Sequence, residues 1–231
     1  MSAGPRAVIF DCDGVIADDE PLHLRVFQAV LAPLGITITT AEYAERYLGL
    51  DDRGVFLEAL RAHGIAPTPA QVAGLIDEKA QRFRRVLESE AHIYPGVVEF
   101  VRSLAGLPLA VASGALREEI EMILRRAGIR DAFAVIVAAE DVHAGKPDPE
   151  GFRAALAALD RLSREGGRIV PAECLVVEDS IAGVEAGRRA GMRCLAVTNS
   201  YPAADLGAAD LVVPTLEGMT LARLRDLLPM G

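Results

Sequence analysis

The sequence predicts an α/β fold in which a doubly wound parallel sheet, a Rossmann-like core, carries an inserted all-helical cap domain. Short apolar runs alternate with segments of helical periodicity along most of the 231 residues, which is typical of parallel sheets covered on both faces. One stretch of about 70 residues shows helical periodicity alone. Hydrophobic residues make up 51% of the chain, enough for a sizeable buried core.

Six short apolar runs are the candidate strands. In chain order they span 7–10, 109–112, 134–137, 174–177, 194–197 and 211–213. Segments with helical periodicity lie between them, at 97–105, 116–127, 149–160 and 181–190. Gly128 and Gly191 follow two of these segments as expected C-caps. This alternation predicts parallel strands joined by right-handed crossovers.

The stretch from residue 21 to residue 91 contains no convincing strand. Helical periodicity covers 22–34, 41–48, 53–63 and 69–87, and Gly35, Gly49 and Gly64 mark the turns between these segments. A helical bundle of this size can bury a core of its own. We therefore expect a helical cap domain at 18–92, inserted into a core formed by 1–17 and 93–231, with a cleft between the two.

Polar side chains follow the ends of four candidate strands. In chain order they are Asp11 and Asp13, Ser113, Lys146, and Glu178 and Asp179. Ligands of an open parallel sheet bind outside the carboxyl ends of its strands. We therefore expect these side chains to meet at one edge of the sheet.

The composition of this set points to phosphoryl transfer. Carboxylates packed together repel each other and hold protons unless a cation neutralises them. Oxygen ligands without His or Cys suit Mg²⁺, which also takes a substrate phosphate oxygen. Lys146 adds a positive charge for the same phosphate, and the Ser113 hydroxyl can donate a hydrogen bond to it. A positioned carboxylate can attack phosphorus and form an acyl phosphate, which makes Asp11 the candidate nucleophile.

Taken in order, the segments Asp11-x-Asp13-Gly14, Ser113-Gly114, Lys146-Pro147 and Glu178-Asp179-Ser180 resemble the four motifs of the haloacid dehalogenase superfamily. The helical insertion after the first motif resembles the α-helical cap of that superfamily. Asp18, His23 and the segment from Lys146 to Pro149 resemble the branch that holds β-phosphoglucomutase and related sugar-phosphate phosphatases.

The resemblance implies roles for the first pair of acids. Asp11 would be the nucleophile and a metal ligand. Asp13 would protonate the leaving group and then activate water, and its backbone carbonyl would bind the metal. Dehalogenases of this superfamily lack the second aspartate, because a halide leaving group needs no proton. The presence of Asp13 therefore argues against dehalogenation.

The resemblance also implies roles for the later motifs. Ser113 and Lys146 would hold the transferring phosphoryl group. Asp179 would bind Mg²⁺, with Glu178 beside it, directly or through water.

Five further residues are candidates for substrate binding: His23, Arg53, Lys79, Gly114 and Ala115. His23 either reaches the cleft or is a helix residue without a role. Arg53 either binds a second anionic group of the substrate or only follows a turn in which Asp51 or Asp52 caps the next helix. Lys79 either contacts substrate phosphate, as a cap lysine of the mutase branch does, or lies on a solvated helix face.

Charge and cysteine content narrow the expected partners. The net charge is -9 and basic residues form no long run, which disfavours nucleic acid as a partner. The apolar run from Val8 to Phe10 near the N-terminus is far too short for a signal peptide or a membrane span. The three Cys lack C-x-x-C spacing and indicate buried free thiols in a reducing compartment. We expect a cytoplasmic protein with a small phosphorylated substrate and no membrane partner; its oligomeric state stays open, a monomer being plausible.

The leading hypothesis is a Mg²⁺-dependent phosphatase that hydrolyses a small phosphorylated metabolite, with sugar phosphates as the expected class, through an aspartyl phosphate. A phosphomutase of the β-phosphoglucomutase type is the alternative, because it uses the same core chemistry and differs in its cap contacts. A binding or regulatory protein without turnover is a weaker alternative, since the fold alone does not dictate function.

Overall fold

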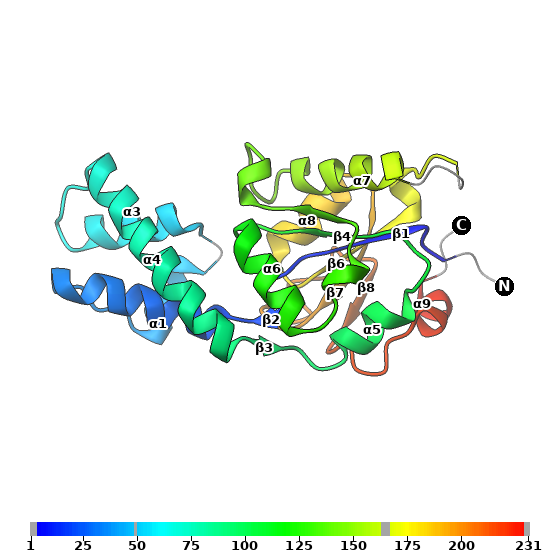
Figure 1. The fold of residues 1–231 in the computed structure, drawn as a ribbon, viewed down its shortest axis with the longest axis horizontal. Coiled ribbons are helices and arrows are strands. Elements are labelled where there is room, and N and C mark those ends of the chain that lie inside the picture. The colour runs from blue at the N-terminus through cyan, green and yellow to red at the C-terminus, as the bar shows by residue number, and fades with distance from the viewer. Residues whose placement is uncertain (1–3, 49, 163–166, 229–231) are drawn as a thin grey trace. The chain divides into compact units, whose positions relative to one another are not determined.

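The computed structural model describes residues 4–48, 50–162 and 167–228, and its main sheet confirms the predicted fold class (Figure 1). Six parallel strands are hydrogen-bonded in the order β5-β4-β1-β6-β7-β8. Their bounds are β1 Ala7–Phe10, β4 Leu109–Ala112, β5 Val135–Val137, β6 Cys174–Glu178, β7 Arg193–Val197 and β8 Leu211–Val213. Because β1 lies between β4 and β6, the sheet grows outward on both sides of it, which is the doubly wound arrangement.

Helices cover both faces of this sheet. They are α5 Val97–Ser103, α6 Arg117–Arg126, α7 Glu150–Leu162, α8 Ile181–Arg189 and α9 Leu221–Leu227. Successive strand residues point to opposite faces. Ile9 accordingly belongs to the hydrophobic cluster that contains Phe152 of α7 and Val184 of α8. Phe10 packs on the rings of Phe100 and Phe133, whose centroids lie 5.8 and 5.6 Å away.

The chain divides into two compact units, one formed by Met1–Asp18 with His92–Gly231 and the other by Asp19–Ala91. The first unit contains the main sheet and an antiparallel two-stranded ribbon of β2 Ala17–Asp18 and β3 His92–Ile93. The sequence predicted no strand at either place. Each strand of the ribbon has two residues, too few to show a periodicity.

The second unit is helical, as the sequence predicted. Its helices are α1 Glu20–Leu31, α2 Thr40–Glu42, α3 Asp52–Ala62 and α4 Pro69–Glu90. The Asp51 carboxylate accepts a hydrogen bond from the Gly54 N–H at 2.7 Å, so the expected cap before α3 is confirmed. The helical segment predicted at 41–48 is helical in the structure, but of two types: after α2 the chain continues as a π-helical turn, Tyr43–Tyr47, in which the Leu48 N–H donates to the Tyr43 carbonyl. Both tyrosines are buried, and the wider turn holds both rings in the core.

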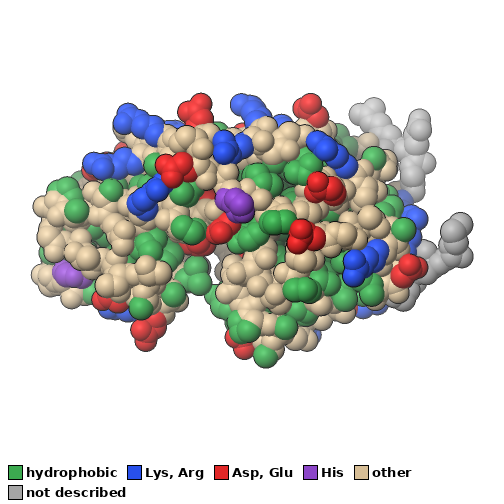
Figure 2. All heavy atoms as spheres, turned by 90° about the horizontal axis from the view of Figure 1, so that it is seen from below, with side chains coloured by type: hydrophobic (Ala, Val, Ile, Leu, Met, Phe, Trp, Pro, Cys, Tyr) green, Lys and Arg blue, Asp and Glu red, His purple; other side chains and the backbone are tan. Residues whose placement is uncertain are grey.

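Shorter helical turns complete the structure. They are η1 Ala32–Leu34, η3 Arg130–Ala132, η4 Ala139–Asp141 and η5 Pro171–Glu173. No helix in the described part of the chain combines the length and apolar character that a bilayer crossing needs. On the face shown in Figure 2, acidic and basic side chains are interspersed, so that face presents no broad positive surface.

Candidate active site

Asp11 lies at the carboxyl end of β1. Its N–H donates to the Val177 carbonyl of the neighbouring β6 at 2.9 Å, which fixes the backbone, and the residue is 7% exposed. The Lys146 Nζ lies 2.7 Å from Asp11 Oδ1 and 2.5 Å from Glu178 Oε1. Lys146 thus bridges two buried carboxylates that neighbouring strands supply.

Glu178 is fully buried, and its second oxygen is satisfied by the turn that follows β6. Oε2 accepts hydrogen bonds from the N–H groups of Asp179 and Ser180, both at 2.7 Å, and from the Ser180 hydroxyl at 2.9 Å. Ser180 also caps α8, where its hydroxyl accepts from the Gly183 N–H at 3.0 Å. The start of the helix therefore fixes Glu178 and the adjacent Asp179 at the strand end.

Asp13 lies in a tight turn directly after Asp11. The Gly14 N–H donates to the Ala17 carbonyl at 2.8 Å, and the Ile16 N–H donates to the Cys12 carbonyl at 2.7 Å. Gly14 has a φ of +76°, and a Cβ there would lie 2.0 Å from Asp179 Oδ2. Only glycine allows both this backbone conformation and this close approach. Gly14 therefore allows the turn that holds Asp13 to pack directly against the Asp179 carboxylate.

The charges of this cluster are unbalanced. Burial raises the pKa of Asp11 to about 6, although the Lys146 ammonium acts in the opposite direction. Burial and the negative charges of Glu178 and Asp11 raise the pKa of Asp179 well above its usual range. Burial also opposes the Glu178 anion, but Lys146 and the neighbouring N–H groups lower its pKa overall. Burial disfavours the Lys146 cation as well, yet Asp11 and Glu178 raise its pKa, so it stays charged.

A divalent cation fits this donor set. Asp11, Glu178 and Asp179 each offer one carboxylate oxygen, and these atoms all lie within 4.8 Å of one another. Their all-oxygen chemistry suits Mg²⁺. A positive charge here would also lower the raised pKa values of Asp11 and Asp179. The backbone contact expected of Asp13 with the metal stays a prediction.

Ser113 lies at the same edge of the sheet, two residues beyond the pairing of β4 with β1. Its N–H donates to the Val137 carbonyl at 3.1 Å, and its hydroxyl accepts from the Ala115 N–H at 3.2 Å. Ser113 and Ala115 are buried, whereas Gly114 between them is exposed. The structure thus brings the residues of all four motifs to the carboxyl edge of one sheet.

Two residues of this edge were not among the predicted site residues. The Ser200 hydroxyl donates a hydrogen bond to Asp179, and the Asn199 Nδ2 donates to the Gly14 carbonyl at 2.7 Å. Both follow β7. Their position after a strand is the one signal in the sequence that pointed to them.

The remaining substrate candidates lie in the helical unit. The His23 ring stacks on Phe83 with centroids 4.0 Å apart, and its Nε2 lies 3.6 Å from Asp19 Oδ2. Lys79 is 1% exposed, so the alternative of a solvated helix face is wrong. Its Nζ lies 2.9 Å from Asp52 Oδ1 and 4.4 Å from the Phe83 ring centroid. Arg53 is exposed. Substrate contacts of these residues stay predictions.

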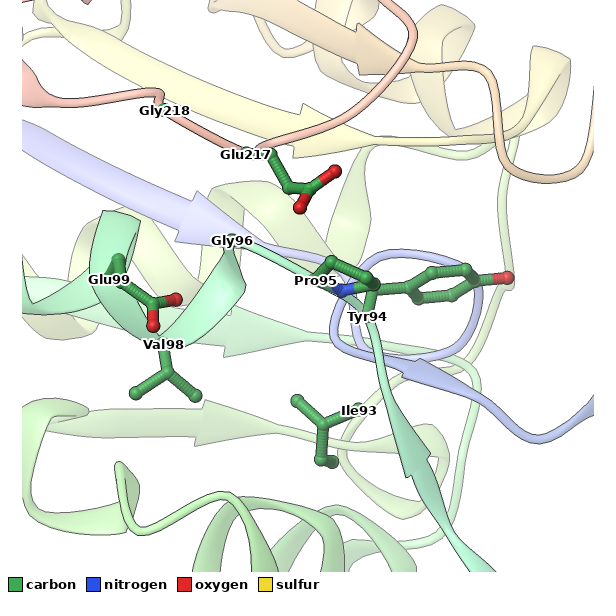
Figure 3. A pocket seen from close by; sticks show the side chains of 8 residues that line it. All are labelled: Ile93, Tyr94, Pro95, Gly96, Val98, Glu99, Glu217 and Gly218. Carbon is green, nitrogen blue, oxygen red and sulfur yellow. The ribbon is translucent and has the colours of Figure 1, made fainter.

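A separate hollow of about 520 Å³ lies where α5 begins (Figure 3). It is lined by Ile93, Tyr94, Pro95, Gly96, Val98, Glu99, Glu217 and Gly218. None of the four motifs contributes to its lining.

Fold and site together define an α/β enzyme with a cluster of buried carboxylates, able to hold a cation, at the carboxyl edge of its sheet. Residues 5–191 match the family model of haloacid dehalogenase-like hydrolases, and the chain belongs to this family. The resemblance of the four motifs to the haloacid dehalogenase superfamily is thereby confirmed. The predicted enzyme class, phosphoric monoester hydrolase, is confirmed as well.

Individual relatives show the same family. The chain is 32% identical to an Arabidopsis thaliana chloroplastic 5-amino-6-(5-phospho-D-ribitylamino)uracil phosphatase over 98% of this chain, and spans 59% of that protein. It is 30% identical to the β-phosphoglucomutase of Bacillus subtilis, over 96% of this chain and 94% of that protein. The crystal structure of CbbY from Rhodobacter sphaeroides in complex with phosphate is similar with a TM-score of 0.83, 30% identity, and coverage of 95% of this chain and 99% of that one.

Proposed function

We propose that the chain is a Mg²⁺-dependent phosphatase that hydrolyses a small phosphorylated metabolite of the sugar-phosphate class through a phosphorylated Asp11. The proposal rests mainly on one observation. Lys146 Nζ lies 2.7 Å from Asp11 Oδ1 and 2.5 Å from Glu178 Oε1, and Asp179 belongs to the same acidic cluster. The cluster holds a nucleophilic carboxylate, a fixed cation and further oxygen ligands in one place, which phosphoryl transfer requires.

In this proposal Asp11 and Asp179 hold the metal through carboxylate oxygens. Both oxygens of Glu178 already accept hydrogen bonds from protein groups, which supports a contact of Glu178 with the metal through water. When bound, Mg²⁺ supplies positive charge that offsets the negative charge of the phosphoryl oxygens.

The reaction proceeds in two displacements. A carboxylate oxygen of Asp11 attacks phosphorus while the bond to the leaving oxygen breaks, and Asp13 gives that oxygen its proton. Asp13, now ionised, takes a proton from water as the water oxygen attacks the phosphorus of the aspartyl phosphate. Inorganic phosphate leaves, and the Asp11 carboxylate and the Asp13 acid are restored. The Lys146 ammonium and the Ser113 hydroxyl hold the phosphoryl oxygens during both displacements.

The substrate class rests on the relatives and on the helical unit. One relative is named for a phosphoribityl compound and another for phosphoglucose. We assign residues 18–92 as a cap domain that excludes bulk water during the first displacement and selects the substrate through His23, Arg53 and Lys79. The expected cytoplasmic location belongs to the same proposal.

Asp11→Asn tests the proposal. The amide keeps the size of the side chain but lacks the nucleophilic carboxylate, so kcat on p-nitrophenyl phosphate with Mg²⁺ should fall by roughly 10⁴-fold or more. Asp131→Asn is the matched control, because Asp131 is exposed and lies before β5, not after a strand. Circular dichroism should show both variants folded. Turnover of Asp11→Asn comparable to that of the control would rule the mechanism out.

The relationship to β-phosphoglucomutase supports a second candidate, a phosphomutase that returns the phosphoryl group to a sugar. The two activities share every residue of the core site. Incubation with β-glucose 1-phosphate and a bisphosphate primer distinguishes them: a mutase yields glucose 6-phosphate, and a phosphatase yields glucose and inorganic phosphate.

A further inference from the structure

The loop after β7 contacts both acidic motifs of the site. Asn199 donates to the Gly14 carbonyl, and Ser200 donates to the Asp179 carboxylate. We propose that both are positioning residues: Asn199 fixes the turn that carries Asp13, and Ser200 fixes Asp179 as a metal ligand. This inference rests on the proposed function and deepens it, because it assigns a separate task to each hydrogen bond.

Asn199 acts on Asp13 through the backbone. Gly14 has no side chain and a positive φ, so local sterics restrain it little. The bond from Asn199 at 2.7 Å holds the Gly14 carbonyl from outside the turn, one residue away from Asp13. Asn199 is itself anchored, because the N–H of the preceding Thr198 donates to the Val213 carbonyl at 3.1 Å and extends the pairing of β7 with β8. A shift of this turn would move Asp13 away from the leaving oxygen.

Ser200 acts on Asp179 directly. The Asp179 carboxylate is buried between the Ser200 hydroxyl and the Gly14 backbone. The backbone approaches so closely that a Cβ on Gly14 would lie 2.0 Å from Asp179 Oδ2. These two neighbours leave the carboxylate little room to rotate. Hydrogen-bond partners that orient metal ligands typically change metal affinity by 10- to 100-fold when they are removed.

The role of Asn199 in positioning Asp13 is tested with two substrates that differ in their leaving groups. A sugar phosphate releases an alkoxide that needs a proton from Asp13, whereas dinitrophenyl phosphate releases a stable phenolate that does not. Asn199→Ala should lower kcat/KM about tenfold or more on the sugar phosphate and about twofold at most on dinitrophenyl phosphate. Asn199→Asp, which keeps the size and removes the N–H donor, gives the same test if the alanine variant does not fold. An equal loss on both substrates would overturn this half.

The Ser200 half is tested by binding of Mg²⁺ alone, measured by calorimetry without substrate. Ser200→Ala should weaken Mg²⁺ about tenfold, and Ser200→Thr, which keeps the hydroxyl, should restore most of the affinity. Thr198→Ala is the matched control on the same loop, and it should change neither measurement. A Mg²⁺ affinity of Ser200→Ala equal to that of the control would overturn this half.

Failure of the proposed function is distinguishable from failure of this inference. It would show in the unsubstituted chain as phosphate release that does not depend on Mg²⁺ or that survives Asp11→Asn. The inference fails, by contrast, if the enzyme is active and the loop variants do not show the expected differences in leaving-group dependence or Mg²⁺ affinity.

Discussion

Lys146 supplies the positive charge that balances the buried carboxylates of the site. Its ammonium compensates two carboxylates that are nearly inaccessible to water, Asp11 and Glu178. Removing one partner of a buried ion pair leaves an uncompensated charge, which costs more than the pair itself contributes. The same ammonium stabilises the apo fold and keeps Asp11 closer to its ionised form.

Lys146→Met should therefore destabilise the metal-free protein by about 3 kcal/mol, measured by urea unfolding. The loss should be smaller near about pH 5 than near about pH 8. Buried carboxyls without a cation have raised pKa values in the folded state, so the folded state gains stability relative to the unfolded chain as they take up protons at lower pH. Arg61→Met, at an exposed position, is the control and should change stability by less than about 0.5 kcal/mol. Equal stability of the two variants would contradict the account.

At the scale of elements, the site is built where strands end and helices begin. Gly183, in the first turn of α8, lies against Glu178: a Cβ there would be 1.7 Å from Glu178 Oε1. Glu178 is fully buried and held on both oxygens, so it cannot yield easily. Gly74 in α4 is also a helix glycine, but a Cβ there would meet nothing within 4 Å.

The two glycines should respond to alanine with opposite signs. Gly183→Ala should destabilise the protein by about 2 kcal/mol or more through overpacking. Gly74→Ala should stabilise it by roughly 0.5–1 kcal/mol, because alanine loses less backbone entropy in a helix. Thermal unfolding of both variants measures the difference, and a destabilised Gly74→Ala or a neutral Gly183→Ala would contradict the packing described here.

The sequence predicts the bounds of an element well where the buried residues fit only one kind of secondary structure. Strands β1 and β4 have the predicted bounds because each is an apolar run buried along its whole length. Residues 43–47 were predicted as helical but not as a π-helical turn, because the two buried tyrosines, Tyr43 and Tyr47, fit either kind of helix. The motif acids were predictable because they lie at the end of a strand or within three residues after it. Asn199 and Ser200 also follow a strand, but their hydrogen bonds were not predictable, since their partners, Gly14 and Asp179, are set by tertiary structure.

At the scale of the whole molecule, a chain of net charge -9 concentrates buried carboxylates at one edge of its sheet. A cation bound there by the folded state alone stabilises that state by mass action. A metal bound there would take part in the folding equilibrium as well as in the proposed catalysis.

Mg²⁺ at about 100 times its dissociation constant should stabilise the protein by about 2.7 kcal/mol, a rise in Tm on the order of 5 °C, and a chelator should reverse it. Asp179→Asn should lose most of this rise, whereas Asp131→Asn should keep it. Differential scanning calorimetry with and without Mg²⁺ makes the comparison. An undiminished rise in Asp179→Asn would show that the cation binds elsewhere.

The proposed mechanism requires the Asp11 carboxylate to act as the nucleophile. Turnover of a phosphate ester with Mg²⁺, quenched in acid and digested for mass spectrometry, tests it most directly. We predict one phosphoryl group on the peptide that contains Asp11, sensitive to hydroxylamine as acyl phosphates are, and absent from Asp11→Asn. A phosphoryl group on any other side chain during active turnover would contradict it.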